Sequence, residues 1–286
     1  MSILIDGLSL GAVYALIALG YTMVYGIAKM LNFAHGDIIM IGAYAIYVVL
    51  SMNVNPLITI AVAVVVCTLM GILIEKLAYK PLRGASPLAV LITAIGVSNL
   101  LQGIAQLIFG STSISFTVFN FSTVKIFGAE ISWGTLITLG VGALIMVALT
   151  LFVKKTKTGR AMIAVSEDSG AARLMGVNVD RIIMITFAIG SALAAFASLF
   201  YIIRIPSATP TLGAMPGIKA FTAAVIGGIG SIPGAMIGGI LLGIIEQICK
   251  NTPIADYTTA VEFALLIVIL LVKPVGLLGK QRREKV

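Results

Sequence analysis

The stretch LITIAVAVVVCTLMGILIEKLA, residues 57–78, decides the fold class, because it carries no charge before Glu75. A helix needs about 20 apolar residues to cross the hydrocarbon core of a bilayer. The runs are continuous and lack the period-two alternation of a strand barrel, so the sequence predicts transmembrane helices. Comparable runs lie at residues 8–28, 88–109, 134–153, 182–203 and, with flanks, 258–272.

The composition supports the same class of protein. Of the 286 residues, 59% are hydrophobic and 10% are charged, whereas a soluble domain carries about 25% charged residues. A soluble fold could not bury so much apolar surface. We therefore expect an all-α integral membrane protein in which residues 1–286 form a single transmembrane domain.

Two regions are less regular than these runs. Residues 38–50 form an apolar run that is too short to span the membrane alone. Residues 213–249 are apolar but interrupted by Pro216, Pro233 and several glycines, and we expect two short or broken helices there. With these regions, the sequence predicts a polytopic helical bundle of eight or nine membrane segments.

Basic residues gather in three clusters, and Lys and Arg are enriched in cytoplasmic loops. The net charge of +8 is therefore a topology signal, and no nucleic-acid partner is expected. The C-terminus is predicted to lie in the cytoplasm, while the side of the N-terminus stays open. The clusters are Lys76, Lys80 and Arg83; Lys154, Lys155, Lys157, Arg160, Arg173 and Arg181; and Lys273, Lys280, Arg282, Arg283 and Lys285.

This topology defines two long loops. Residues 110–133 form the main external loop, for which a β-hairpin and a short helix on the membrane surface are both open. Residues 154–181 form a cytoplasmic loop containing SEDSGAARLMGVNVDR, residues 166–181. The pattern predicts a helix at about 166–176, with Ser166 as N-cap, acids in the first turn and Gly176 at C′.

This amphipathic helix is too short to be stable alone, so it must rest on something. A narrow apolar stripe is formed by Ala171, Leu174 and Met175. Two interpretations remain open: a surface helix folded against its own membrane domain, or a docking helix that enters a groove on a partner protein.

Three long segments make the chain similar to a known family. They are KTGRAMIAVSEDSGAARLMGVNVDR (157–181), LGYTMVYGIAKMLNFAHGD (19–37) and AFTAAVIGGIGSIPGAMIGGILLGIIE (220–246). From about Gly7 to Val286 the sequence resembles the permease subunit of bacterial branched-chain amino acid ABC importers. The resemblance implies transport across the bacterial cytoplasmic (inner) membrane, in contact with lipid. It also implies a second permease chain, related or identical, two ATP-binding subunits and a periplasmic or extracellular binding protein.

In that family a cytoplasmic loop with an acid, two small residues and a following glycine couples the permease to the ATPase. The family pattern matches Glu167, Ala171, Ala172 and Gly176, although the letters DSG separate the acid from the alanines. This departure puts single-residue assignments in doubt, but not the loop. The coupling candidates are Glu167, Asp168, Ala171, Ala172, Arg173, Leu174 and Gly176.

The sequence contains no G-x-x-x-x-G-K-[ST] motif, which ATP hydrolysis at a P-loop requires. Its Gly279–Lys280 pair is followed by Gln281. ATP and Mg²⁺ are therefore expected on partner subunits, with no cofactor in this chain. No metal cluster, nucleophile–base pair or acid dyad is evident, so we expect a transport subunit with no catalytic or metal-binding residues.

Polar residues inside apolar segments are the candidates for the transport path, because such groups are costly in lipid. They are Asn32, His35 and Asp37 in LNFAHGD, and Asn99, Gln102 and Gln106, which share a face of the 88–109 helix. The first three could instead satisfy a helix break, and the amides could instead bond between helices. Glu246 and Glu262 are expected at solvated or interfacial positions.

Two other functions remain open from the sequence. Permeases for urea, short amides or sugars would share the importer class. An ion-coupled secondary transporter would need a buried acid such as Asp37 or Glu246 as its coupling site.

Overall fold

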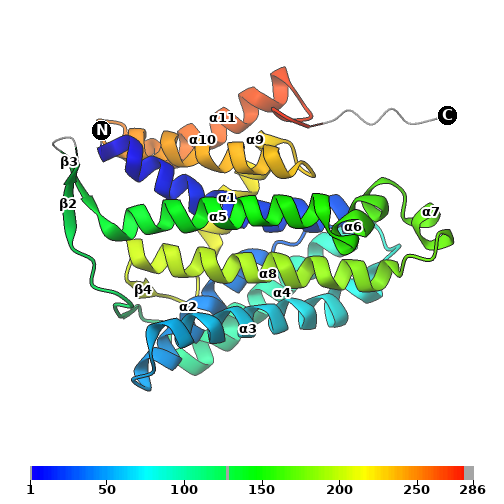
Figure 1. The fold of residues 1–286 in the computed structure, drawn as a ribbon, viewed down its shortest axis with the longest axis horizontal. Helices are drawn as coiled ribbons and strands as arrows, with labels where there is room; N and C mark the ends of the chain where they lie inside the picture. Colours follow the sequence, from blue (N-terminus) through cyan, green and yellow to red (C-terminus); the bar gives the residue numbers. More distant parts are fainter. Residues whose placement is uncertain (1, 127–128, 280–286) are drawn as a thin grey trace.

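The computed structural model describes residues 2–126 and 129–279, which form an elongated helical bundle (Figure 1). Within these residues, seven helices are long and apolar enough to cross a membrane. Two shorter apolar helices, α2 (His35–Ser51) and α9 (Ala214–Gly227), complete the set. The seven are α1 (Ser2–Ala28), Pro56–Leu82, α4 (Pro87–Phe109), α5 (Trp133–Lys155), α8 (Val179–Arg204), α10 (Ile232–Lys250) and Ala255–Val272.

Two of these spans are composite. The span Pro56–Leu82 consists of α3 (Pro56–Ile74), a π-helical turn η1 (Glu75–Tyr79) and a 3₁₀ turn η2 (Lys80–Leu82). The last span joins the 3₁₀ turn η3 (Ala255–Tyr257) to α11 (Thr258–Val272). The polytopic helical bundle predicted from the sequence is thus confirmed, with both irregular regions helical.

The prolines of the second irregular region begin helices and do not break them. Pro216 lies in the first turn of α9, and Pro233 lies in the first turn of α10. At these positions the missing N–H costs nothing, because it would have no partner inside the helix. Ser231 caps α10 by accepting a hydrogen bond from the Gly234 N–H at 3.3 Å. The expectation of two short or broken helices is therefore wrong for α10, which is long enough to span.

The loop over 110–133 contains a β-hairpin, one of the two alternatives left open. Strands β2 (Thr123–Ile126) and β3 (Ala129–Ser132) pair antiparallel, with Thr123 opposite Ser132. A second small ladder joins β1 (Ile114–Ser115) to β4 (Ser207–Ala208), which follows α8. The loop is thereby fastened to the bundle at one end.

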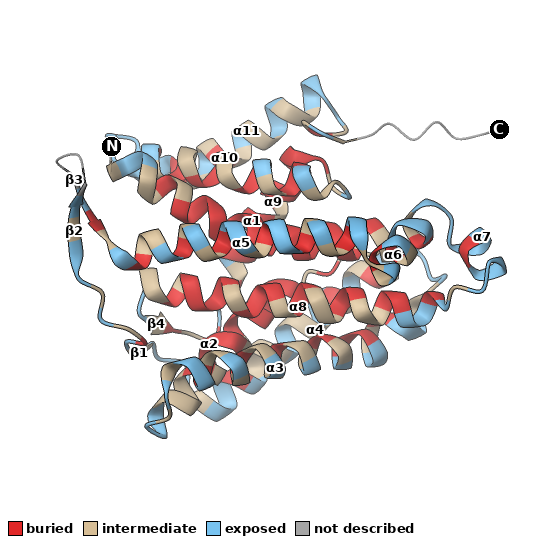
Figure 2. Ribbon diagram, viewed as in Figure 1, coloured by how far each residue is buried: buried red, intermediate tan, exposed pale blue. Residues whose placement is uncertain are grey.

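The core is built around α1, which is buried along most of its length (Figure 2). Glycines let α1 and α10 approach until their backbones touch. A Cβ added at Gly11 would lie 2.6 Å from Ile240 Cα, and one at Gly7 would lie 3.0 Å from Ile244 Cα. The small-residue patterns in these two helices therefore serve close packing within the chain.

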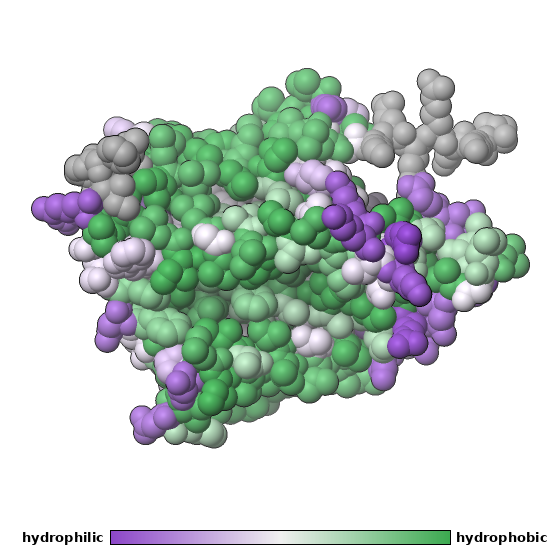
Figure 3. All heavy atoms as spheres, viewed as in Figure 1, coloured by the Kyte–Doolittle hydropathy of each residue, from purple (hydrophilic) through white to green (hydrophobic). Residues whose placement is uncertain are grey.

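Hydrophobic side chains cover the long sides of the molecule, and hydrophilic ones gather toward its two ends (Figure 3). One end, which we call the basic end, carries the first two clusters of Lys and Arg. Asp180 at the start of α8 joins them, with its carboxylate 2.5 Å from Arg83 and 4.0 Å from Lys80. Lys280, Arg282, Arg283 and Lys285 of the third cluster lie outside the described residues.

The opposite end, which we call the hairpin end, holds β2, β3 and the start of α1. Thr135 Oγ1 donates to Asp6 Oδ1 at 3.5 Å, and Arg204 donates to the Asp6 carbonyl at 3.3 Å. The first turns of the chain therefore lie at the end away from the first two basic clusters. The sequence alone had left this side open.

Candidate functional site

The segment between α5 and α8 protrudes at the basic end as two helices, α6 (Lys157–Glu167) and α7 (Ser169–Leu174) (Figure 1). The prediction of one helix at 166–176 capped by Ser166 is wrong. The chain is extended at Asp168, whose Oδ1 accepts from the N–H groups of Gly170 at 2.8 Å and Ala171 at 2.9 Å. Ser166 lies in the last turn of α6 instead, with its hydroxyl donating to the Ile163 carbonyl at 2.7 Å. Asp168 accepts two N–H groups and is therefore the cap of α7.

The apolar residues of α7 and its C-cap do not pack on the bundle. Leu174 is 91% exposed and Met175 is 84% exposed, and Ala171 is exposed as well. Only Ala172 turns inward, at 5% exposure. Gly176 occupies C′ with a φ of +83°, as the sequence predicted, because this left-handed conformation is costly for a residue with a Cβ. The outer face of α7 therefore presents uncovered apolar side chains at the basic end.

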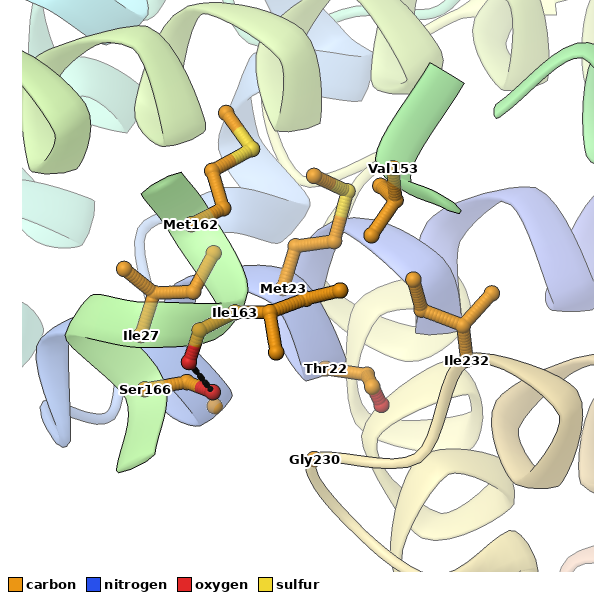
Figure 4. Close-up of a pocket in the computed structure, with 10 residues that line it drawn as sticks. Thr22, Met23, Ile27, Val153, Met162, Ile163, Ser166, Gly230 and Ile232 are labelled. Atoms are coloured by element: carbon orange, nitrogen blue, oxygen red, sulfur yellow. Dashed lines mark hydrogen bonds between the residues drawn. The ribbon is translucent and has the colours of Figure 1, made fainter. Parts of the chain in front are cut away.

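Helix α6 braces the protrusion against the bundle. Its residues Met162 and Val165 are buried, and Thr156 caps it by accepting from the Gly159 N–H at 3.0 Å. A small cavity of about 80 Å³ lies beneath it, lined by residues of α1, α5, α6 and the turn before α10 (Figure 4). Its lining includes Met23 and Ile232. Thus α6 packs against α1 and faces the start of α10 across this cavity.

Inside the bundle, the two short helices meet end to end. At 1.5 Å per residue, α2 is about 25 Å long and α9 about 21 Å, so each is shorter than the roughly 30 Å hydrocarbon core. A Cβ added at Gly36 of α2 would lie 2.6 Å from the Gly213 carbonyl oxygen and 3.3 Å from Gly217 Cα. The first turns of both helices therefore touch through glycine backbone.

The two helices lead away from this contact toward opposite ends. Near its C-terminus, α2 places Tyr47 against Phe116 of the external loop, with ring centroids 5.4 Å apart. Helix α9 ends at Gly227, whose carbonyl accepts from the Leu278 N–H at 2.8 Å, close to the basic end. Broken helices of this kind place backbone ends and polar groups inside transport proteins.

The polar residues of LNFAHGD are all buried at this break. Asn32 is 3% exposed and His35 is 1% exposed. Tyr79 donates its hydroxyl to Asn32 Oδ1 at 2.9 Å, and His35 lies edge-on to Tyr21 with ring centroids 4.8 Å apart. A Cβ at Gly20 of α1 would collide with the His35 ring, so glycine makes room for it. The structure therefore places Asn32 and His35 in the packing around the break.

Asp37 is 2% exposed and lies in the first turn of α2. Gln102 of α4 donates to Asp37 Oδ1 at 2.8 Å and to Ser98 Oγ at 3.3 Å. Among residues 2–126 and 129–279, no Lys or Arg forms an ion pair with the Asp37 carboxylate. A buried carboxylate is thus held by neutral donors alone.

The three amides of α4 do not act as a group. Gln102 turns toward Asp37, whereas Asn99 and Gln106 are exposed on the outer face of the helix. The interpretation that all three share one face is therefore wrong in its consequence. At about 100° per residue, Gln102 lies about 60° around the helix from Asn99 and about 40° from Gln106. These angles are enough to place Gln102 inside and the other two outside.

A cluster of charged side chains is buried between α9, α10 and α11, and the sequence did not predict it. Lys219 lies 2.9 Å from Glu246 and 3.1 Å from Glu262. Tyr14 donates to Glu246 at 2.6 Å, and Lys250 reaches the same carboxylate at 2.6 Å. Of the expected solvated or interfacial positions, the solvated one is wrong, since Glu246 and Glu262 are 2% and 1% exposed. The overlooked signal was Lys219, a lone cation in an apolar stretch that requires an acidic partner.

A helical membrane bundle with half-length helices meeting inside it has the architecture of a transport protein. Comparison with known proteins identifies which transport proteins it is similar to. The family model for the permease component of branched-chain amino acid transport systems matches residues 3–270. The chain belongs to this family.

Two relatives match over almost the whole chain. The high-affinity branched-chain amino acid transport system permease protein BraD of Pseudomonas aeruginosa is 42% identical over 297 residues, covering 99% of this chain and 97% of BraD. The corresponding protein LivH of Escherichia coli K12 is 43% identical over 295 residues, covering 98% of this chain and 96% of LivH. The ribose import permease RbsC of Haemophilus influenzae shares 26% over 267 residues, covering 90% of this chain and 80% of RbsC. These identities favour the branched-chain permeases over the sugar permeases.

Proposed function

We propose that this chain is the permease subunit of an ATP-driven importer that carries branched-chain amino acids across the bacterial cytoplasmic membrane. The near full-length similarity to BraD and LivH supports this function most strongly. The sequence lacks a P-loop, so ATP and Mg²⁺ bind to partner subunits and the chain itself is not an enzyme. The same similarity argues against the ion-coupled transporter that buried Asp37 or Glu246 would otherwise suggest.

The partners follow from the importer class and from the charge of the two ends. By the positive-inside rule the basic end, with the C-terminus, faces the cytoplasm, where two ATP-binding subunits dock. The hairpin end then faces the external binding protein that delivers the substrate. A second permease chain, related or identical, completes the path.

We assign the docking of an ATP-binding subunit to α7 and the transmission of its motion to α6. Leu174 and Met175 are large apolar side chains that water surrounds in the single chain, and a partner groove would cover them. Glu167, Asp168 and Arg173 flank them as exposed charges. Because α6 packs against α1 and α8 of the core, a push on α7 reaches these helices.

The outer face of α4 is proposed to lie against the second permease chain. Asn99 and Gln106 are exposed there, and nothing lies within 4 Å of a Cβ added at Gly96 or Gly103 of the same face. Amides in contact with lipid are costly, so a second chain or a water-filled path is the favourable neighbour.

Reconstitution tests this proposal as a whole. The chain, expressed with its neighbouring reading frames, is expected to purify together with ATP-binding subunits. In proteoliposomes, leucine uptake is expected to require ATP on the side of the membrane that the basic end faces. It is also expected to require the liganded binding protein. Uptake that continues without ATP while a proton gradient persists, or by this polypeptide alone, would contradict the function.

Replacing Leu174 with aspartate tests the docking role of α7. The Leu174→Asp permease chain is expected to insert into the membrane and fold with normal thermal stability, because the side chain is solvent-exposed in the single chain. Transport is expected to fall about tenfold or more, since loss of a buried apolar anchor at an interface commonly costs 2 kcal/mol or more. The measurement is uptake together with co-purification of the ATP-binding subunits.

Leu174→Met is the matched control, because it keeps an apolar side chain of similar volume and should transport normally. Equal uptake by Leu174→Asp and Leu174→Met would remove the docking role from this side chain.

A further inference from the structure

A cavity of about 170 Å³ lies where the first turns of α2 and α9 meet, beside α4. We call it the half-helix pocket. It is several times the roughly 30 Å³ that one water occupies in the liquid, so it has room for a small solute. Its polar lining comes from Tyr21, Asp37, Ser98 and Gln102, and its apolar lining includes Phe33, Ile95 and Ile218.

One wall of the half-helix pocket carries a carboxyl group without a counterion. Asp37 is 2% exposed, and its carboxylate accepts a hydrogen bond from Gln102 at 2.8 Å. No ion pair to it exists among the described residues, although Lys219 forms ion pairs with Glu246 and Glu262 elsewhere in the bundle. Buried charges in membrane proteins are normally paired or functional, so Asp37 lacks the cation that such a site calls for.

The facing wall has the opposite polarity. Helix α9 begins at Ala214 with its positive dipole end at the pocket, and its first turn contains no acidic residue. Helix α2 differs, because its first turn already contains Asp37. Gly213 and Gly217 lie against the backbone of Gly36. Pro216 has no N–H, and the Ala214 N–H donates to the Thr211 carbonyl at 3.0 Å. The α9 dipole, more than free N–H groups, is thus what this helix end offers an anionic group.

We propose that the half-helix pocket binds the amino-acid head group of the transported solute. The ammonium group contacts the Asp37 carboxylate and the carboxylate group contacts the first turn of α9. The aliphatic side chain then lies against Ile95, Ile218 and Phe33. The inference rests on the proposed import of branched-chain amino acids and adds to it a substrate-contacting residue within the membrane.

The arrangement distinguishes a zwitterion from other solutes. A sugar or an amide has no ammonium group to balance Asp37, and would leave the buried carboxylate unpaired. A metal cation would balance Asp37, but would leave the α9 helix end and the apolar wall without a partner. A small aliphatic amino acid satisfies all three walls at once.

Binding to the assembled complex in nanodiscs, without the external binding protein, tests the proposal. Radiolabelled leucine is expected to bind, and isopentylamine is expected to compete with it. 3-Methylbutanol, which has the same carbon chain and a neutral head group, is expected not to compete. Equal competition by the amine and the alcohol would overturn the inference without any substitution. Leucine binding that appears only with Na⁺ and is not displaced by isopentylamine would also overturn it.

Asp37→Asn is the charge test, because asparagine can still accept the Gln102 hydrogen bond. Leucine affinity is expected to fall about tenfold or more, with isopentylamine competition lost. Competition by 4-methylpentanoate, which lacks the ammonium group, is expected to persist. Asp256→Asn on the exposed turn η3 is the matched control and should bind leucine normally.

The two proposals fail differently. If the wild-type complex takes up no leucine with all its partners present, the proposed function is wrong. If wild-type uptake is normal and Asp37→Asn binds and transports leucine as the wild type does, only the half-helix pocket assignment is wrong. Asp37→Glu keeps the charge, so isopentylamine is expected to compete with leucine in this variant but not in Asp37→Asn.

Discussion

Replacing Lys219 with methionine is expected to lower the free energy of unfolding by about 3–5 kcal/mol, the cost typical of removing one partner from a buried ion pair. Lys219 is 8% exposed and stands between two carboxylates, 2.9 Å from Glu246 and 3.1 Å from Glu262. In the variant Glu246 keeps Lys250 and Tyr14, whereas Glu262 keeps no cation. Two buried acids would then face one another with too little positive charge. Thermal denaturation of the purified complex in detergent measures the change.

A double variant isolates the cause of this loss. Lys219→Met combined with Glu262→Gln restores charge balance, because Glu246 remains paired with Lys250, and should recover part of the lost stability. Lys250→Met is the control, since that side chain is 50% exposed and Glu246 keeps Lys219 in its absence, so a smaller loss is expected. A Lys219 variant no less stable than the Lys250 variant, or a double variant less stable than the single one, would contradict the role of the buried cluster.

The second large effect is expected at Gly243, where leucine should prevent α1 and α10 from packing. A Cβ at Gly243 would fall onto the backbone of Gly11, which cannot move aside as a flexible side chain can. Overpacking in a close-packed core commonly costs 1–3 kcal/mol and more where backbone must shift, so we expect about 3 kcal/mol or a failure to fold. The readouts are the yield of monodisperse protein and its melting temperature.

Gly140→Leu is the matched control for this substitution. Gly140 lies in α5 with no atom within 4 Å of an added Cβ, so leucine there only adds apolar surface facing lipid. Similar losses of yield and melting temperature in both variants would show that leucine at any helix glycine is harmful, and would contradict a specific role for the α1–α10 contact.

The sequence predicted the helical bundle because apolar length is a local property that lipid enforces. Each of the runs at 88–109 and 134–153 corresponds to a helix that begins one residue earlier than the run, directly after a serine N-cap. The prediction of a broken helix at Pro233 was wrong, because proline breaks a helix in its middle but is favourable in its first turn. Whether Pro233 begins or interrupts a helix depends on Ser231, whose capping role is clear only in three dimensions.

The site was predictable in kind but not in partners. Polar letters inside apolar runs pointed to Asp37 and Gln102, and the structure brings them to 2.8 Å although 65 residues separate them. The same reasoning placed Glu246 and Glu262 near water, because each lies close to the end of its own run. Their burial depends on Lys219 of a third helix, and pairing across helices is not encoded in any single segment.

The join between α2 and α9 has a mechanical consequence. Two half-length helices, one leading to each side of the membrane, replace a single continuous helix, and their first turns meet through the backbone at Gly36 and Gly213. Drawing α9 back by its cytoplasmic turn would open a gap there without bending any full-length helix.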